Sequence, residues 1–250
     1  MFEVMSVIDF SCGLSPSRAI AILTNSPFAL LPAKWQEIWS KAAFRCATDG
    51  AANHLRPFCE SQTGLKLPHL VSGDFDSISD HTKKYLAENN VEIIETEDQN
   101  NTDLTKLIKL VCDRKDLEWD VIFILGGFGG RFDHTMASLN SLLKSQEWTS
   151  KPVFLLDHEN LTTMLHKGHT KVSFANISSP LFSKSCGLIP IVQRETIVSL
   201  EGFQWNLDKF SLQFGGLIST SNNIVEEEVE IDTNEPLIFT LQTDWKMFEV

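Results

Sequence analysis

The chain has 250 residues and a formal net charge of −12, which results from 21 basic and 33 acidic side chains. This excess of acid disfavours binding to nucleic acids or to anionic membranes, because both need basic patches. No apolar run approaches the roughly 18 residues of a membrane-spanning helix, and the 42% hydrophobic content is typical of a globular protein with one large domain or two moderate ones.

The five cysteines are widely separated and include no CxxC pair, which argues against a zinc site or a disulfide framework. Such scattered cysteines are typical of a reducing compartment, so we expect a cytoplasmic protein. Residues 1–17 show little pattern and none of the basic leader that signal and transit peptides carry. We expect them to form a loose N-terminal arm.

The first clear pattern begins after this arm. A short apolar run at residues 19–23 predicts a central strand, and apolar residues follow at helical spacing over residues 35–43. Residues 44–48 predict a second strand, which ends at Asp49 with small residues behind it. Asp49 is therefore a carboxylate at a strand end, although capping of a helix over residues 51–55 is the simpler explanation when the residue is taken alone.

The stretch at residues 69–78 organises the rest of the chain. Its apolar run predicts a buried strand that stops at Gly73, where the backbone can turn sharply, and Asp74 and Asp76 follow at once. Alternate residues of an extended backbone point the same way, so both carboxylates can reach one cation from one side. Two carboxylates with water and phosphate oxygens form the ligand set that Mg²⁺ prefers. The alternative is a turn that caps the next helix.

A third acidic segment, residues 97–103, follows a polar helix and a short strand at residues 91–94. Apolar spacing from Thr102 onward predicts a helix, with Thr102 or Asn101 as its N-cap and Asp103 in its first turn. The helix dipole favours an acid at that position regardless of function. If the sheet is parallel, however, Asp103 lies on the same edge as the earlier carboxylates.

The clearest buried strand, residues 119–125, runs into a glycine-rich loop at residues 126–130. Backbone N–H groups of such a loop, together with a helix start, form an anion site, and Arg131 adds a planar donor fork that suits phosphate. A plain glycine turn is the alternative, and the sequence contains no P-loop motif. In the helix that follows, the side chains expected to point inward are those of Met136, Leu139, Leu142 and Leu143.

Strands that alternate with helices up to about residue 147 predict an α/β domain with a parallel sheet. Beyond it, short β-rich runs separated by glycine, proline and asparagine predict an all-β sandwich. We therefore expect an arm at residues 1–17, an α/β domain at residues 18–150 and a β-sandwich domain at residues 151–250, with the boundary near residues 148–160.

These motifs, in this order, resemble the thiamine pyrophosphokinase family of the eukaryotic type. The resemblance covers roughly residues 18–245 and is carried by four motifs in the first domain and three in the second. The motifs are residues 49–53, 72–77, 98–103, 125–133, 186–190, 202–207 and 216–222. One departure is Ala51, where the family usually has a second glycine.

The resemblance implies a Rossmann-like N-terminal catalytic domain, a C-terminal β-sandwich, and a homodimer with sites at the subunit interface. It also implies transfer of pyrophosphate from ATP to the hydroxyl of thiamine, with Mg²⁺ as cofactor and with thiamine diphosphate and AMP as products. Because such a transfer depends mainly on positioning and on stabilisation of phosphoryl charge, acids that hold a metal and donors that hold phosphate are the residues to seek.

On this resemblance, Asp74, Asp76 and Asp103 are expected to bind the metal, and Gln99 and Arg131 to complete the catalytic set. The ATP-binding residues are expected to be Asp49, Asn53, Gly73, Thr102, Gly126, Gly127, Arg131 and Asp133. Thiamine is a cation with two aromatic rings, which suits stacking on Trp205. Its polar contacts are expected from Ser219, Ser221 and Asn222.

Two other functions fit the same residues. The first is another Mg²⁺-dependent phosphotransferase or a nucleotide hydrolase with paired aspartates. The second is a thiamine- or nucleotide-binding regulator without activity, since a fold does not fix a function. A regulator has no need of the complete set of acids, Gln99 and Arg131, so the sequence favours an enzyme.

Overall fold

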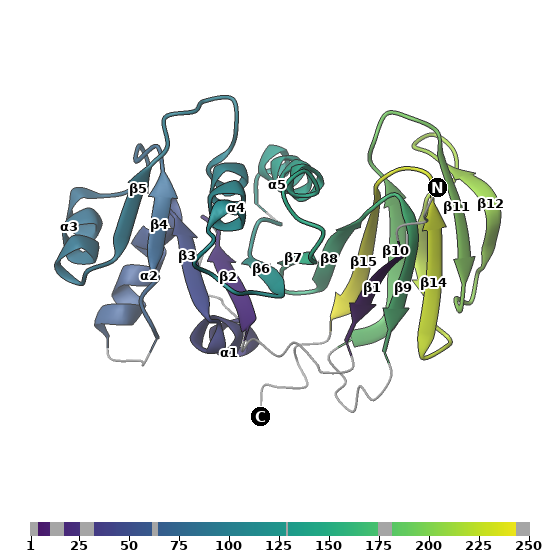
Figure 1. Ribbon diagram of the computed structural model, residues 1–250, viewed down its shortest axis with the longest axis horizontal. Coiled ribbons are helices and arrows are strands. Elements are labelled where there is room, and N and C mark those ends of the chain that lie inside the picture. The colour runs from purple at the N-terminus through teal and green to yellow at the C-terminus, as the bar shows by residue number, and fades with distance from the viewer. Residues whose placement is uncertain are drawn as a thin grey trace. The chain divides into compact units, whose positions relative to one another are not determined.

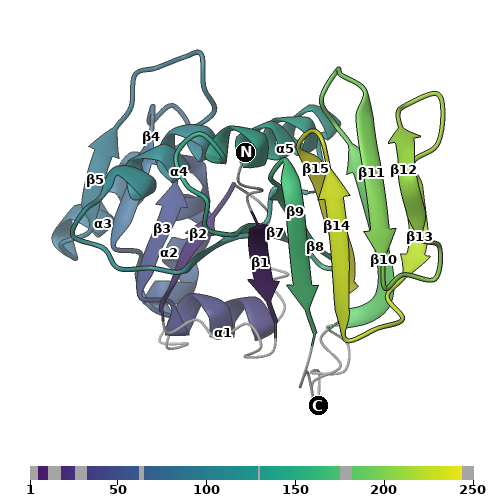
Figure 2. The same ribbon diagram turned by 45° about the vertical axis from the view of Figure 1, so that its right-hand side comes forward.

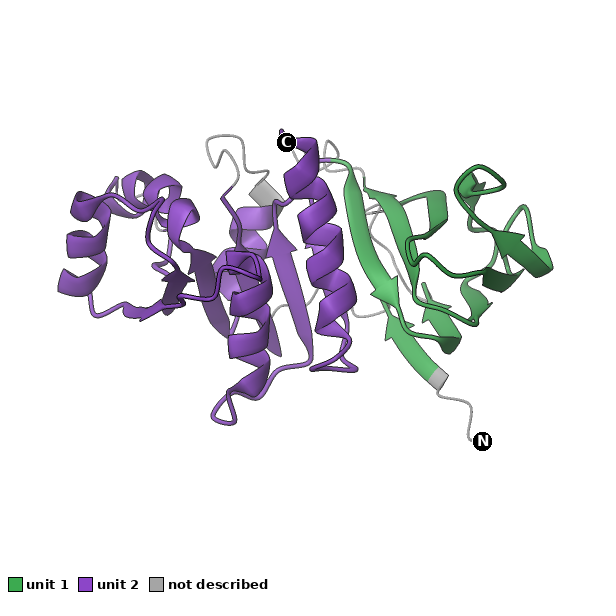
Figure 3. Cartoon of the chain, turned by 90° about the horizontal axis from the view of Figure 1, so that it is seen from above, with its two compact units in different colours: residues 1–14, 159–250 green, residues 15–158 purple. Residues whose placement is uncertain are grey.

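The computed structural model describes residues 5–10, 18–25, 33–61, 65–128, 130–174 and 182–243. The chain forms two compact units, residues 15–158 and residues 1–14 with 159–250, which Figure 3 distinguishes by colour. Most of the expected arm (residues 1–4 and 11–17) and Gly129 of the glycine-rich loop lie outside the described residues. We describe each unit by itself.

The α/β unit contains parallel strands in the order β7-β6-β2-β3-β4-β5, with helices between successive strands (Figure 1). Its elements in chain order are β2 (Ala19–Leu23), α1 (Ala33–Lys41), β3 (Phe44–Thr48), α2 (Asp49–Glu60), β4 (Leu70–Gly73), α3 (Asp80–Glu88), β5 (Glu92–Glu95), α4 (Asp103–Asp113), β6 (Val121–Leu125), α5 (Phe132–Ser145) and β7 (Val153–Leu156). The expected parallel α/β architecture is thus confirmed.

The core of this unit follows from the sequence of its strands. Every residue of β2, β3, β4 and β7 is buried, as expected where helices cover both faces of a parallel sheet. Strand β5 instead carries exposed Glu92 and Glu95 at the edge of the sheet. Charged side chains at such an edge disfavour pairing with another chain.

The order of the strands places the candidate site. The chain runs from β2 through β3 and β4 to β5, and then returns to the other side of β2 with β6. In open α/β sheets, ligands bind at the carboxyl ends of the strands, where the strand order reverses. In this unit that point lies between β2 and β6, beside the ends of β3 and β4.

The helices α4 and α5 pack against each other and flank this point. Thr102 is the N-cap of α4, as predicted, because its side chain accepts a hydrogen bond of 3.3 Å from the Thr105 amide. Met136 of α5 was predicted to face inward but is 40% exposed, and Phe132 one turn earlier is 74% exposed.

Among the described residues, no helix is long and apolar enough to cross a membrane.

The second unit is built of two sheets (Figure 2). One contains β8 (Asn160–Leu165), β15 (Leu237–Thr243), β10 (Phe182–Pro190) and β13 (Ser219–Asn223), all antiparallel. The other has the order β1-β9-β14-β11-β12, formed by β1 (Met5–Asp9), β9 (Gly168–Ser173), β14 (Glu228–Thr233), β11 (Thr196–Glu201) and β12 (Leu207–Leu212). The expected β-rich second part of the fold is confirmed.

The units divide the chain differently from the expected domains. Strand β1 lies within the segment predicted to be a loose arm, and it pairs in parallel with β9 from Met5↔His169 to Asp9↔Ser173 (Figure 2). The prediction of a loose arm is therefore wrong for these residues. Strand β7, expected within residues 151–250, pairs with β6 of the α/β unit. The change of unit falls at residues 158–159, inside the predicted boundary region.

Candidate active site

Three carboxylates meet at the carboxyl ends of two neighbouring strands. Asp49 follows β3 as the first residue of α2, and Asp74 and Asp76 follow β4, which pairs in parallel with β3. One carboxylate oxygen from each of the three residues lies within 4.8 Å of the others. Closely spaced carboxylate oxygens suit a hard divalent cation. The structure therefore brings Asp74 and Asp76 together and adds Asp49, which the resemblance places among the ATP-binding residues.

The geometry that joins Asp74 and Asp76 is a turn, and the expected extended backbone is not found there. Phe75 between them has φ +63°, in the left-handed region. The amide of Asp76 donates a hydrogen bond of 3.2 Å to Asp74 Oδ1, as in a turn closed by an aspartate side chain. The two carboxylates thus converge because the backbone turns between them. An extended backbone would instead run straight through these residues.

The environments of the acids differ. Burial raises the pKa of Asp49, and the neighbouring Asp103 and Asp74 raise it further, against the effect of hydrogen bonds from the Gly50 and Ser77 amides. The amide of Asp76 lowers the pKa of Asp74, and the hydrogen bond from the Gln99 side chain lowers it as well. An added positive charge would favour the ionised form of every carboxylate in this group.

Gly73 allows the close approach of Asp49. A Cβ atom at position 73 would lie 2.6 Å from Asp49 Cγ and 2.7 Å from Asp49 Cβ, well inside van der Waals contact. Both residues are buried. Any side chain at position 73 would therefore displace the carboxylate of Asp49. The absence of a side chain at Gly73 thus lets Asp49 take its place in the acidic group.

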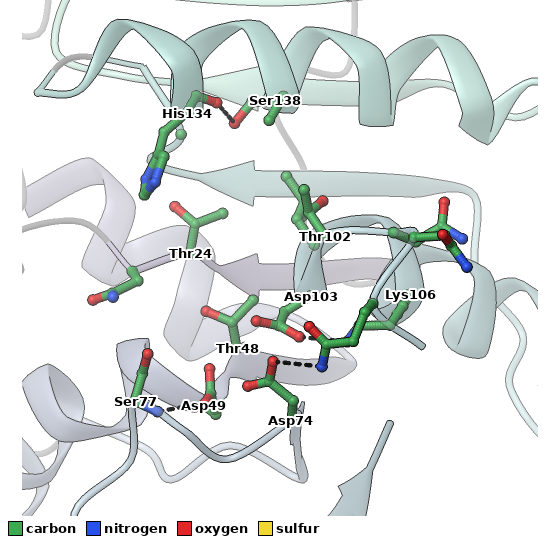
Figure 4. A pocket seen from close by; sticks show the side chains of 17 residues that line it. Thr24, Thr48, Asp49, Asp74, Ser77, Thr102, Asp103, Lys106, His134 and Ser138 are labelled. Atoms are coloured by element: carbon green, nitrogen blue, oxygen red, sulfur yellow. Dashed lines mark hydrogen bonds and ion pairs between the residues drawn. The ribbon is translucent and has the colours of Figure 1, made fainter. Parts of the chain in front are cut away.

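A cavity of about 460 Å³ lies beside Asp49 and Asp74. Figure 4 shows the side chains that line it. Of the predicted residues, it is lined by Asp49, Asp74, Gln99, Thr102, Asp103 and Gly127. Gln99 donates a hydrogen bond of 3.3 Å to Asp74 Oδ2, so the segment after β5 reaches the acidic group directly. Residues from the ends of β3, β4, β5 and β6 thus share one cavity.

Other predicted ATP-binding residues do not line this cavity. Asn53 instead joins α2 to the segment after β4, since its side chain bonds the Ser77 carbonyl at 2.7 Å and the Ser79 amide at 3.0 Å. Arg131 directs its planar fork at Asp133, with contacts of 3.1 and 2.5 Å between exposed side chains. Gly73 and Gly126 are also absent from the lining. Ala51, the departure from the family pattern, is buried within α2 and likewise does not line the cavity.

The cavity also contains residues that sequence reasoning missed. They are Thr24, Asn25, Thr48, Ser77, Asn100, Asn101, Leu104, Lys106, His134, Ala137 and Ser138. Thr24 directly follows β2, so its position at a strand end could have identified it in the same way as Asp49. His134 and Ser138 are four residues apart on α5, and this helical spacing places them on one face toward the cavity.

In the β unit, Asn222 organises the other predicted residues. Its buried side chain accepts a hydrogen bond of 3.1 Å from the Trp205 amide and donates one of 2.9 Å to the Trp205 carbonyl. It also lies 3.3 Å from Ser219 Oγ. Trp205 is 53% exposed, while Ser221 is exposed with φ +55°. Asn222 thus holds the Trp205 backbone against β13, and its polar atoms are already occupied by the protein.

Comparison with known proteins gives matches over both units. Residues 35–155 match the family model described as the thiamin pyrophosphokinase catalytic domain, and residues 172–238 match that of the thiamin pyrophosphokinase vitamin B1 binding domain. Thiamin pyrophosphokinase 1 from Caenorhabditis elegans is 34% identical over 241 residues, which cover 95% of this chain and 93% of the relative. Thiamine pyrophosphokinase 1 from Oryza sativa subsp. japonica is 33% identical, with 91% and 88% covered.

The likeness extends to the fold. The crystal structure of yeast thiamin pyrophosphokinase aligns with a TM-score of 0.81 at 23% identity, and the alignment covers 96% of this chain and 92% of that chain. Thiamin pyrophosphokinase from Candida albicans aligns with a TM-score of 0.79, also at 23% identity. At this identity the structures establish the fold, while the sequence relatives establish the family.

Proposed function

Because the chain belongs to the thiamin pyrophosphokinase family, we propose that the cavity beside Asp49, Asp74 and Asp76 is where it transfers pyrophosphate from ATP to thiamine. The protein is an ATP-dependent enzyme that forms thiamine diphosphate, with AMP as the second product. The observation that carries the assignment of the site is the convergence of three carboxylates within 4.8 Å inside the catalytic-domain match.

We propose Mg²⁺ as the cofactor, because the charges that line the cavity do not suit ATP alone. The carboxylates of Asp49, Asp74 and Asp103 line it, and the ammonium of Lys106 lies 2.8 Å from Asp103 Oδ1. A polyphosphate would be repelled by this surface unless a cation came with it. Asp49, Asp74 and Asp76 fit such an ion as ligands, and Asp103 would add a further oxygen from the start of α4. When bound, the ion would stabilise the charge on the phosphoryl oxygens.

The other predicted site residues act by orienting the substrates. Gln99 is held against Asp74 and can turn its amide toward a phosphate oxygen or the thiamine hydroxyl. Thr102 and Gly127 line the cavity at the starts of α4 and of the loop before α5, where backbone N–H groups favour anions. Arg131, which now pairs with Asp133, would offer its fork to the transferred group.

We further propose that thiamine binds in the β unit beside Trp205, whose exposed indole suits stacking with a cationic aromatic ligand. Ser219 and Ser221 would add polar contacts, while Asn222 fixes the Trp205 backbone. The thiamine hydroxyl must come within about 3–3.5 Å of the phosphorus that it attacks.

A homodimer would allow this, with the α/β unit of one subunit facing the β unit of its partner. Exposed apolar side chains in both units support the proposal: Phe132 and Met136 on α5, and Phe210, Phe214 and Leu217 around the end of β12.

A cytoplasmic location is proposed from the scattered cysteines, of which Cys46, Cys59, Cys112 and Cys186 are free.

The products formed from ATP test the function and separate it from its alternatives. Purified protein with ATP and Mg²⁺ is assayed with and without thiamine, and AMP, ADP and thiamine diphosphate are measured by chromatography. AMP and thiamine diphosphate in equal amounts, only when thiamine is present, support the proposal. ADP or phosphate formed without thiamine would indicate a different phosphotransferase or a hydrolase. Thiamine binding without any turnover would indicate a regulator.

A further inference from the structure

The ammonium of Lys106 on α4 is enclosed by oxygen atoms, and the side chain is only 8% exposed. Nζ donates hydrogen bonds of 2.9 Å to the Thr96 carbonyl and 3.1 Å to the Asp98 carbonyl. It also lies 2.8 Å from Asp103 Oδ1, in an ion pair whose angles do not make it a hydrogen bond. A buried ammonium is costly unless oxygens surround it in this way.

These oxygens come from two segments that meet beside the cavity. Thr96 and Asp98 lie in the segment after β5 that carries Gln99, and the Gln99 amide bonds Asp74 Oδ2. Asp103 is the first residue of α4 and lines the same cavity. One ammonium thus ties the backbone that presents Gln99 to the acid at the start of the helix. Figure 4 labels Asp103 and Lys106 of this ion pair, with Asp74 nearby.

Other contacts also hold the segment. The Thr96 amide donates a hydrogen bond of 2.8 Å to the Gly73 carbonyl. The Asp98 side chain accepts hydrogen bonds from the Asn100 amide and the Asn101 side chain, which close the segment on itself. Lys144 of α5 contacts the Asn101 side chain at 2.5 Å. Of these lysines, only Lys106 bonds the main chain of the segment and also contacts an acid of the cavity.

Two of its three donors are already directed at carbonyls of the protein. An ammonium has three N–H donors. Two of them serve the carbonyls of Thr96 and Asp98, and Asp103 opposes the charge on the remaining side. A phosphate would therefore have to displace a protein oxygen to gain more than one N–H of this ammonium.

We infer that Lys106 is a positioning residue for the reaction. Its ammonium fixes the segment at residues 96–101 so that Gln99 meets Asp74, and it holds the carboxylate of Asp103 in the cavity without contacting the substrate. The role in turnover rests on the proposed function, whereas the anchoring of the segment does not. Lys109, one turn further along α4, is a matched control because it is 54% exposed and pairs only with Asp113 among the contacts described.

The test compares Lys106→Met and Lys109→Met with the parent. In metal-free protein without substrates, hydrogen exchange of the bonded amides of Thr96 and Asn100 should become at least tenfold faster in Lys106→Met and stay unchanged in Lys109→Met. In the assay, Lys106→Met should lower kcat and raise the Mg²⁺ concentration for half-maximal rate, each by about 10- to 100-fold, as for partners that orient metal ligands. The KM for thiamine should stay within about twofold, since the inference gives Lys106 no contact with thiamine.

Two results would overturn the inference. Parent-like exchange in Lys106→Met would show that the ammonium does not anchor the segment, even if turnover falls because of direct contact with substrate. Parent-like kcat and Mg²⁺ requirement would show that the anchor is irrelevant to the reaction. If Lys106→Met does not fold, Lys106→Arg takes its place, because a planar guanidinium cannot match the same three oxygens. If the parent forms no AMP with thiamine, the proposed function fails, and the exchange measurement still decides the anchoring.

Discussion

Gly73 is the residue at which one methyl group would disturb the acidic group most. Alanine at this position would place Cβ 2.6 Å from Asp49 Cγ, and Asp49 is itself held by the amides of Gly50 and Ser77. We expect Gly73→Ala to lower the free energy of unfolding by about 1–3 kcal/mol, the usual cost of overpacking. We also expect a higher Mg²⁺ requirement in the turnover assay, since Asp49 must move. Urea unfolding and a Mg²⁺ titration measure the two effects.

Gly216 provides the control. The three atoms nearest to a Cβ atom there belong to the side chain of Gln213, which is exposed and can move aside. Gly216→Ala should therefore leave both the free energy of unfolding and the Mg²⁺ requirement near parent values. If Gly73→Ala behaves like Gly216→Ala in both measurements, Asp49 does not need the space that Gly73 leaves.

At the residue scale, the sequence identified the acids but not their geometry. Apolar runs that end in aspartate mark strand ends, and this pattern found Asp49, Asp74 and Asp76. It could not reveal the left-handed Phe75, because nothing in the residue type predicts φ +63° for a phenylalanine. It also missed Lys106, since a lysine near a helix start is usually solvated, and its burial depends on carbonyls at positions 96 and 98.

At the scale of elements, the strands of the α/β unit were predictable because they are buried on both faces. Residues 19–23 and 153–156 are continuous apolar runs, residues 44–48 are apolar except for Arg45 and Thr48, and the structure has strands at these positions. Strand β13 is Ser219–Asn223, which has no apolar residue, so its pairing with β10 depends on partners distant in the sequence. Strand β1 likewise forms only because β9 offers it an edge.

The junction between β13 and the segment that carries Trp205 gives a prediction for the β unit. Asn222→Ala removes the side chain that bonds both the amide and the carbonyl of Trp205. Leaving these two groups without partners should lower the free energy of unfolding by about 1–3 kcal/mol. The KM for thiamine should rise more than the KM for ATP, because Trp205 loses its backbone support. Thermal unfolding and steady-state kinetics test both expectations.

The neighbouring Asn223 serves as the matched variant. Its side chain bonds only the side chain of exposed Gln204 among the contacts described, so Asn223→Ala should change the stability by less than about 0.5 kcal/mol. Equal effects of Asn222→Ala and Asn223→Ala on the KM for thiamine would contradict the role given to Asn222.

At the scale of the whole molecule, the proposed homodimer predicts that two inactive variants can complement each other. Trp205→Ala damages the thiamine side of a site, and Asp74→Asn damages the metal side. After subunit exchange, half of the dimers are mixed, and each mixed dimer has one site with both halves intact. The mixture should therefore regain about a quarter of the parent activity. Mass spectrometry verifies that mixed dimers form. If they form without any recovery, each subunit carries its own complete site.

The position of the metal tests the central claim most directly. Mn²⁺ also prefers carboxylate oxygens and scatters anomalously, so it can be located in crystals grown with Mn²⁺, thiamine and a non-hydrolysable ATP analogue. The account predicts an anomalous peak about 2 Å from carboxylate oxygens of Asp74, Asp76 and Asp49, with phosphate oxygens of the analogue as further ligands. A peak bound to the analogue without any of these three residues would contradict it.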